Sequence, residues 1–360
     1  MKMRLLHKLR DLPGVMAKDF PRYLKAVRNS GAGYSSDPEG WISLCNRAER
    51  LERGLDGVGV KCNWEHGSSL HAPLVVPMLG NAILTAALAE WPIEFSTTPC
   101  FPAGDQTVSF IFTHAGEDRL PQLLRTIESI NAQTGVSCEI VVVDQSRVSI
   151  CEKLPTNVKR FRLGNSDLNE GWRKSWGFNV GARIARGNIL VFQDGDVCMP
   201  SRYAFEIVRA LAVSGYGAAS LQRFLFYLDA VSTRRISCKS DALRSARIEV
   251  IRQNWKGGTI AIRRDAFHAI GGFDEGFVDW GGEDVEFYDR CHEIRHLRAG
   301  YLPFIHLWHA PQANRKAADN VNTAHVLPSR LKIPRAQRAA ELRHRDWGNP
   351  LRPDPVERYG

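Results

Sequence analysis

The chain has 360 residues, 44% hydrophobic and 24% charged, which suits one large domain with an extension or two domains. Its longest apolar runs are strand-length, far below the roughly 20 residues of a membrane span, and its basic N-terminus lacks the apolar core of a signal peptide. The eight cysteines form no CxxC pair, which argues against a zinc cluster or a dense disulfide framework, favours a reducing compartment, and leaves isolated pairing open.

The formal charge of +9 lies largely in two basic segments, residues 2–28 and 330–345. Two interpretations fit these segments: contact with an anionic lipid surface, or basic helices that are simply solvated. Nucleic acid is not an expected partner, because no stacking aromatics are interleaved with the basic residues and no zinc-finger or RNA-binding signature appears. We expect a cytoplasmic protein, which under the first interpretation lies at the inner face of a membrane.

Residues 1–105 are predicted to form a mostly helical N-terminal extension of unknown role. Apolar spacing predicts helices over 21–29, 42–53 and 81–90, the last ended by a Trp-Pro pair. A linker over 99–105 follows.

The core domain is predicted to cover 106–312, with 313–360 as a basic C-terminal tail. Buried strands are expected over 108–112, 139–144 and 189–193, and they alternate with two helices, 119–132 and 176–185. Near-continuous apolar strands that alternate with helices indicate an α/β fold with a mainly parallel sheet covered on both faces.

Polar side chains follow each of these strands, at the edge where such sheets bind ligands. They are Thr113 and His114 after the first strand, Asp144 after the second, and Asp194 and Asp196 after the third. Neither GxGxxG nor GxxxxGK[ST] follows the first strand, so this pattern favours a nucleotide site other than the dinucleotide or P-loop type.

Two short motifs can each be interpreted in two ways. Asp194-Gly195-Asp196 can hold a divalent cation against a diphosphate, or it can be a plain Asp-Gly turn. The pair Gly257-Gly258 enters a short apolar strand and permits close backbone approach to a ligand, or it forms a tight turn.

The loop Trp280-Gly-Gly-Glu-Asp284 places two carboxylates beside an aromatic ring, just before a helix predicted over 285–292. Asp284 can act as a general base, Glu283 can hold the substrate and Trp280 can stack on a sugar face. The alternative is a helix N-cap with acidic residues in its first turn. Downstream, His306 and His309 can complete a metal sphere or contact phosphate, whereas a lone histidine there would be structural.

In this order, the motifs resemble those of the GT-A glycosyltransferases. Over about residues 106–312, the chain is similar to the β-1,4-galactosyltransferase C-terminal domain and to bacterial chondroitin-polymerase-type and family 2 transferases. The resemblance implies the GT-A fold, a Rossmann-like mixed sheet. The most specific pieces are the Asp-x-Asp triplet and the Trp-Gly-Gly-Glu-Asp block.

The resemblance also implies roles for individual residues. Asp196 and His309 would bind Mn²⁺ or Mg²⁺, with His306 replacing a methionine ligand of the animal galactosyltransferases. Asp284 would be the base, and Glu283 would orient sugar hydroxyls. The implied donor contacts are Thr113, His114 and Asp144 around the uridine, Asp194 at the ribose and diphosphate, Lys174 near the diphosphate, and Gly258 and Trp280 at the donor sugar.

The hypothesis that follows is a metal-dependent inverting transferase that moves a hexose or N-acetylhexosamine from a nucleotide sugar, UDP-linked by the resemblance, to a glycan or glycolipid hydroxyl. The usual proline after the first strand is absent from 112–115, and retaining relatives carry asparagine at the position of Asp284. A retaining GalNAc-transferase-like enzyme and a catalytically silent sugar-nucleotide or glycan-binding module remain as alternatives; a nucleotidyltransferase lacks its glycine- and lysine-rich loop. The segment 221–254 is expected to be a mobile acceptor-side region.

Overall fold

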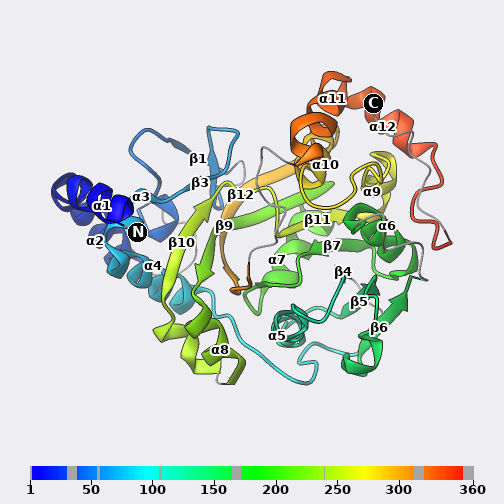
Figure 1. Ribbon diagram of the computed structural model, residues 1–360, viewed down its shortest axis with the longest axis horizontal. Helices are drawn as coiled ribbons and strands as arrows, with labels where there is room; N and C mark the ends of the chain where they lie inside the picture. Colours follow the sequence, from blue (N-terminus) through cyan, green and yellow to red (C-terminus); the bar gives the residue numbers. More distant parts are fainter. Residues whose placement is uncertain are drawn as a thin grey trace.

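The protein is described from a computed structural model, which covers residues 2–30, 39–54, 57–104, 108–163, 172–238, 240–310 and 320–351. The domain boundaries predicted near 105 and 313 fall outside these ranges. Figure 1 shows one large twisted sheet flanked by helices, with the N-terminal helices at one end and the C-terminal helices at the other.

The central part of the sheet is parallel. Strands β4 (Val108–His114), β5 (Cys138–Asp144), β6 (Val158–Arg162) and β7 (Ile189–Gln193) lie in the order β6-β5-β4-β7. All seven residues of β4 are buried, as expected for a strand covered on both faces. The three predicted strands are confirmed, whereas β6 was not predicted because its Val-Lys-Arg-Phe-Arg sequence is that of a half-exposed edge strand.

The other half of the sheet is mixed. Strand β11 (Thr259–Arg263) runs antiparallel to β7, and to β9 (Ala218–Leu228) on its other side. β12 (His296–His306) is parallel to β9, and β10 (Ile248–Gln253) is antiparallel to β9. β8 (Val197–Cys198) pairs with the end of β12.

The expectation of a mobile region over 221–254 is therefore wrong at both of its ends, which are strands of the sheet. Phe224, Leu225 and Phe226 of β9 are fully buried. Between the two strands lies helix α8 (Ala230–Cys238).

Alternating side chains of the strands build a hydrophobic core on each face of the sheet. On β4, Phe110 and Phe112 face one core and Ile111 faces the other. Helices α5 (Leu120–Asn131) and α7 (Tyr203–Val208) contribute to the first core. The second core takes its helical residues from α6 (Lys174–Ile184), α9 (Arg264–Ala269) and α10 (Glu283–Arg290). The mixed α/β architecture predicted from the sequence is confirmed.

The N-terminal region is mostly helical, as predicted. It contains α1 (Lys2–Gly14), α2 (Phe20–Asn29), α3 (His71–Val75) and α4 (Pro77–Glu90). Three short strands accompany these helices: β1 (Leu51–Arg53), β2 (Val60–Cys62) and β3 (Ser68–Ser69). β2 pairs with β12 and β3 pairs with β10, so the extension continues the core sheet (Figure 1).

The helix predicted over 42–53 is wrong. A single 3₁₀ turn, Trp41–Ser43, is followed by irregular chain and then by β1. The buried guanidinium of Arg223 donates hydrogen bonds to the carbonyls of Ile42 and Leu44, 2.7 Å from Nε to the former. A helix would need these carbonyls for its own backbone bonds, so a residue from β9 overrides the local apolar spacing.

The C-terminal segment is not a loose basic tail over its described residues. Helices α11 (Leu327–Lys332) and α12 (Arg335–Arg343) pack on α10. Arg330 and Arg338 are each about 1% exposed and form ion pairs with Asp274 and Glu286. These two charges therefore cannot contact a lipid surface, and they are not solvated either. No helix in the described part of the chain is long and apolar enough to cross a membrane.

The Arg338→Ala variant is expected to lower the free energy of unfolding by about 3 kcal/mol, because it breaks a buried ion pair with Glu286. Urea denaturation followed by circular dichroism measures this change. Arg343→Ala on the same helix is the matched control, since Arg343 is exposed and its loss is expected to change stability by less than about 0.5 kcal/mol. Equal stability of both variants would contradict a stabilising role for the buried pair.

Candidate active site

A cavity of about 150 Å³ opens at the carboxyl ends of β4 and β7. Seven of the residues predicted to contact donor or metal line it: Thr113, His114, Lys174, Asp194, Asp196, Trp280 and His306. The first core strand, the third strand, the acidic loop and the histidine segment therefore converge on one space, although they are spread over almost 200 positions of the sequence.

Lys174 organises one wall of this site. Its ammonium nitrogen lies 3.1 Å from Asp194 Oδ1, 3.1 Å from Glu283 Oε1 and 3.0 Å from Asp284 Oδ2. The Lys174 side chain is only 7% exposed, so these charge-assisted contacts are shielded from water. One lysine on α6 thus ties the Asp-x-Asp triplet to the two carboxylates that begin α10.

The alternative interpretation, acidic residues in the first turn of a helix, is confirmed as a description of position, because Glu283, Asp284 and Glu286 lie in the first turn of α10. Gly282, with φ +90°, occupies the N-cap position, and the cap makes no side-chain hydrogen bond. Glu283 instead accepts a hydrogen bond from the Gly281 amide at 3.0 Å. Asp284 is therefore committed to Lys174 rather than to the backbone of its own helix.

The electrostatics of this wall set the protonation of Asp284. Burial, aided by the neighbouring carboxylates Glu283 and Asp194, raises the pKa of Asp284 to about 7, although the ion pair with Lys174 opposes the shift. For Lys174, burial disfavours the charged form, but the three carboxylates outweigh it and hold the pKa of the ammonium well above its usual value. Lys174 thus stays charged, while Asp284 exchanges its proton near neutral pH.

The predicted metal ligands form a second group of side chains at the site. Ligand atoms of Asp196, His306 and His309 all lie within 4.8 Å of one another. Nε2 of His309 is 3.2 Å from Asp196 Oδ2, and Nε2 of His306 is 3.7 Å from Asp196 Oδ1. The His306 ring is fixed by stacking on Tyr227, with ring centroids 4.1 Å apart. Asp194 turns away from this group toward Lys174, which separates the roles of the two aspartates.

The chemistry of this donor set fits a divalent cation. Burial works against ionisation of Asp196, but His306, His309 and Arg119 hold the pKa of its carboxyl below the usual range, so it is an anionic ligand. One carboxylate and two imidazoles offer mixed oxygen and nitrogen donors, which suit Mn²⁺ better than the all-oxygen preference of Mg²⁺.

The pocket wall next to β4 and β5 is polar and ordered by side-chain hydrogen bonds. Gln145 Nε2 donates to Thr113 Oγ1 at 2.5 Å, and His114 Nε2 lies 2.7 Å from the Gly116 carbonyl oxygen. Burial lowers the pKa of His114, so it is neutral at pH 7. Neutral hydrogen-bonding groups of this kind suit a nucleobase or ribose rather than a phosphate.

Asp144 occupies a different place from the other predicted donor contacts. It is fully buried, and its carboxylate accepts hydrogen bonds from the Ser146 amide, the Ser149 hydroxyl and the Ile150 amide. Burial opposes ionisation, but these donors lower the pKa of Asp144. Asp144 shapes the loop after β5 and does not line the cavity, so its predicted contact with uridine stays a prediction.

The glycine pair Gly257–Gly258 permits close approach of the backbone to Asp284 and the Asp-x-Asp turn. Gly258 has φ +97°, and its carbonyl accepts from the Asp194 amide at 2.8 Å, which joins β11 to the Asp-x-Asp turn. A Cβ on Gly257 would lie 3.0 Å from Asp284 Oδ2 and 3.3 Å from Trp255 Nε1. The glycine pair therefore lies directly against Asp284.

The Gly257→Ala variant is expected to lower kcat by about tenfold, because the added methyl group displaces Asp284 by a few tenths of an ångström from its place beside Lys174. Affinity for the nucleotide should change little, and steady-state kinetics separate the two effects. The matched control is Gly80→Ala in α4, where a Cβ meets its nearest neighbour at an ordinary 3.5 Å. A Gly257→Ala enzyme with unchanged kcat would show that Asp284 tolerates displacement.

The C-terminal segment braces the acidic loop from outside. Asn320 Nδ2 donates to the Trp280 carbonyl at 2.6 Å, and Asn322 Nδ2 donates to the Val278 carbonyl at 2.6 Å. Both asparagines are less than a tenth exposed. The loop that carries Trp280 and precedes Asp284 is therefore held by residues outside the predicted core domain.

Sequence reasoning missed three residues of the site. Arg119 and Trp172 line the cavity, and Gln145 orders Thr113. Arg119 Nη1 lies 3.7 Å from Asp196 Oδ2, so it brings positive charge next to the metal ligands. The arginine directly before the first core helix carried a signal, since a cation there faces the carboxyl edge of the sheet. The sequence around Trp172 carried no such signal.

Comparison with known proteins agrees with this geometry. Residues 111–272 match the family model described as "Glycosyl transferase family 2". Over 237 residues the chain is 26% identical to "Probable N-acetylgalactosaminyltransferase 9" of Caenorhabditis elegans, which covers 54% of the chain. The chain spans 40% of the length of that relative.

A solved structure described as "Crystal structure of GalNAc-T7 with UDP, GalNAc and Mn2+" aligns with a TM-score of 0.44 and 20% identity, over 58% of this chain and 45% of the other. Trp280 of the acidic loop and His306 lie beyond residue 272, where the family match ends, and both line the same cavity as residues within the match. Through residues 111–272, the chain is therefore similar to the family 2 glycosyltransferases.

Proposed function

We propose that the protein is a metal-dependent inverting glycosyltransferase that moves a hexose or N-acetylhexosamine from a UDP-sugar to a hydroxyl of a glycan or glycolipid acceptor. The observation that carries the proposal is that Lys174 joins Asp284, whose pKa is raised to about 7, to the Asp-x-Asp turn in which Asp196 lies beside two histidines. A general base and a diphosphate-binding group are the two requirements of direct displacement at an anomeric carbon.

In this proposal, Asp284 takes the proton of the acceptor hydroxyl while the acceptor oxygen bonds to the anomeric carbon. The bond from that carbon to the β-phosphate oxygen breaks, and its electron pair leaves with the nucleoside diphosphate. Lys174 holds Asp284 in place and lies near the departing phosphate, and Glu283, fixed by Lys174 and the Gly281 amide, is placed to accept sugar hydroxyls.

Asp196, His306 and His309 are the residues that would hold Mn²⁺, and the ion would offset the negative charge that grows on the leaving diphosphate. Arg119 adds a fixed positive charge beside them. The Trp172 indole N–H, which is buried at the cavity and has no hydrogen-bond partner within the described part of the chain, offers one further donor to a bound nucleotide.

A retaining enzyme is the second candidate, favoured by the similarity to the probable N-acetylgalactosaminyltransferase. The two readings differ at Asp284, which is a base only in the inverting mechanism. Proton NMR of the first-formed product distinguishes them, because inversion of an α-linked donor gives a β-linked product.

A donor screen tests the function itself. The protein with Mn²⁺ is mixed with each common nucleotide sugar, and nucleoside diphosphate release is followed in the presence of an acceptor panel and in its absence. Release from one UDP-sugar supports the proposal and names the donor. If no donor reacts and UDP does not bind in the presence of Mn²⁺, the transferase proposal fails and a silent binding module takes its place.

The rate of transfer is expected to fall as the pH drops through about 7. Since the pKa of Asp284 is raised to about 7, the carboxyl is protonated below that pH and cannot accept the hydroxyl proton. The measurement is kcat against pH at saturating Mn²⁺ and substrates. A flat profile between pH 6 and 8, measured against that expected pKa of about 7, would contradict the role of Asp284 as base.

A further inference from the structure

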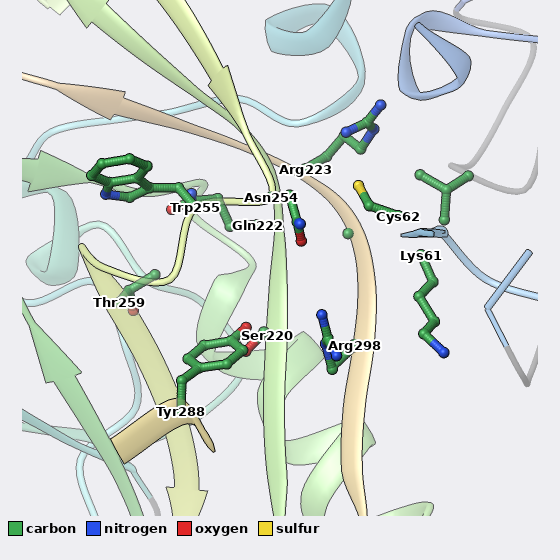
Figure 2. A pocket seen from close by; sticks show the side chains of 12 residues that line it. Lys61, Cys62, Ser220, Gln222, Arg223, Asn254, Trp255, Thr259, Tyr288 and Arg298 are labelled. Carbon is green, nitrogen blue, oxygen red and sulfur yellow. The ribbon is translucent and has the colours of Figure 1, made fainter. Parts of the chain in front are cut away.

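A second pocket lies behind the glycine pair, between the N-terminal extension and the core sheet (Figure 2). Strand β2 contributes Lys61 and Cys62, β9 contributes Ser220 and Gln222, and β12 contributes Arg298. Asn254 and Trp255 close one side, and Tyr288 of α10 lies opposite (Figure 2). None of these residues lines the cavity at the carboxyl ends of β4 and β7, which is the donor cavity of the proposed function.

The pocket is positively charged. Its lining includes Lys61, Arg223 and Arg298, but no aspartate or glutamate among the residues that the structure describes. The guanidinium of Arg223 donates hydrogen bonds to the carbonyl oxygens of residues 42 and 44. Within the described ranges, Arg298 has no carboxylate within 4.0 Å, and its one hydrogen-bond neighbour is the ring of His292 at 3.1 Å. Lys256, next to Trp255 in the sequence, also forms no ion pair with the described residues. Burial, together with the charge of Arg298, lowers the pKa of Lys256.

Cations that are half-buried and lack carboxylates are unfavourable until an anion arrives. The pocket also offers an indole, Trp255, and the buried Oε1 of Gln222, which accepts no hydrogen bond from the described residues. An aromatic face, a hydrogen-bond acceptor and a cation together suit a sugar that carries an acidic group.

The pocket adjoins the proposed base. Trp255 Nε1 and Asp284 Oδ2 both lie within 3.3 Å of the point where a Cβ on Gly257 would stand. On its other flank, the Gln222 amide oxygen lies 3.8 Å from the corresponding point on Gly258. A ligand in this pocket would therefore lie next to Gly257 and close to Asp284, the base proposed to take the proton of the attacking hydroxyl.

The pocket volume limits what it can hold. About 40 Å³ is room for roughly three water-sized groups, at about 10–15 Å³ each, so a carboxylate or phosphate group fits and a whole sugar ring does not. From this geometry we infer that the pocket is an acceptor subsite for an anionic group, carboxylate or phosphate, on the acceptor sugar, with Arg298 as its main contact. The inference rests on the proposed transferase function, and it gives the N-terminal extension a role in choosing the acceptor.

The test compares glucose-based probes that carry a carboxylate, a phosphate or no charged group. Methyl β-glucuronide, methyl β-glucoside and glucose 6-phosphate are titrated into the protein, with and without UDP and Mn²⁺, and binding is followed by ligand-detected NMR. The acidic probes are expected to bind about tenfold more tightly than the glucoside. The ratio between the two acidic probes shows whether the subsite prefers a carboxylate or a phosphate.

Variants connect the preference to the pocket. Arg298→Gln is expected to abolish the preference for acidic probes, and Arg298→Lys, which keeps the charge, to retain part of it. Arg295→Gln is the matched control, because Arg295 is exposed, lies three residues upstream and is not part of the pocket lining. Circular dichroism establishes that each variant is folded.

Equal binding of acidic and neutral probes, absence of binding by all three, or an unchanged preference in Arg298→Gln would each overturn the subsite. These outcomes are separate from failure of the proposed function. If the protein releases UDP from a donor but binds acidic and neutral probes equally, the transferase proposal stands and the acceptor subsite is wrong. If the protein binds acidic probes but neither UDP nor Mn²⁺, the anion site stands and the transferase proposal is wrong.

Discussion

Replacing Asp284 with asparagine is expected to lower kcat for transfer by about a thousandfold, while affinity for UDP in the presence of Mn²⁺ stays within about twofold. Asparagine keeps the size and the contact with Lys174 but cannot accept a proton, and Lys174 retains its other two carboxylates, Asp194 and Glu283. The donor cavity should therefore stay intact, and the loss should be confined to the chemical step.

Steady-state kinetics and UDP titration of the same Asp284→Asn preparation make this measurement. Asp265→Asn is the matched control, because Asp265 is an exposed carboxylate paired with Arg263 outside the site. Transfer by Asp284→Asn at more than about a tenth of the wild-type rate would remove Asp284 from the role of base. With product of retained configuration, that result would favour the retaining mechanism.

Replacing Asp196 with asparagine is expected to weaken binding of UDP with Mn²⁺ by about a hundredfold and to abolish transfer at ordinary metal concentrations. The variant loses the only carboxylate among the three ligand residues and leaves two histidines and Arg119 facing one another without an anion. In the wild type, EDTA should stop transfer, and Mn²⁺ should restore it more fully than Mg²⁺ because two of the donors are imidazoles.

Isothermal titration of UDP, with Mn²⁺ and with EDTA, measures the metal-dependent part of the affinity. His309→Ala should reproduce much of the loss, and His344→Ala, an exposed histidine after α12, should reproduce none of it. Wild-type UDP binding that ignores EDTA would show that Asp196, His306 and His309 do not hold the ion.

The sequence predicts those parts of the fold whose secondary structure follows from the local residue pattern alone. β4, β5 and β7 are apolar runs bounded by turns, and each has polar residues at its carboxyl end. The sequence also groups Asp196 with the histidine pair, and the structure brings ligand atoms of all three residues within 4.8 Å of one another. The resemblance to a family suggested roles for individual residues, but it did not predict the contacts between their side chains.

The parts that escaped prediction depend on partners far away in the sequence. The apolar spacing over 42–53 favours a helix, yet Arg223 takes its carbonyls from 179 and 181 positions away. In the same way, nothing near Lys174 indicates that it would meet Asp194, Glu283 and Asp284 at once. The sequence likewise does not indicate that the loop after Asp144 supplies three hydrogen-bond donors to its carboxylate.

The bracing of the acidic loop by Asn320 and Asn322 has a consequence for how the protein is made. On the ribosome, Trp280 emerges 40 residues before the asparagine that binds its carbonyl. The sheet and the Asp-x-Asp turn can form while the chain is still growing, but Asp284 has no braced loop until the C-terminal helices arrive. A chain interrupted before Asn320 would therefore lack the two side-chain amides that hold the acidic loop.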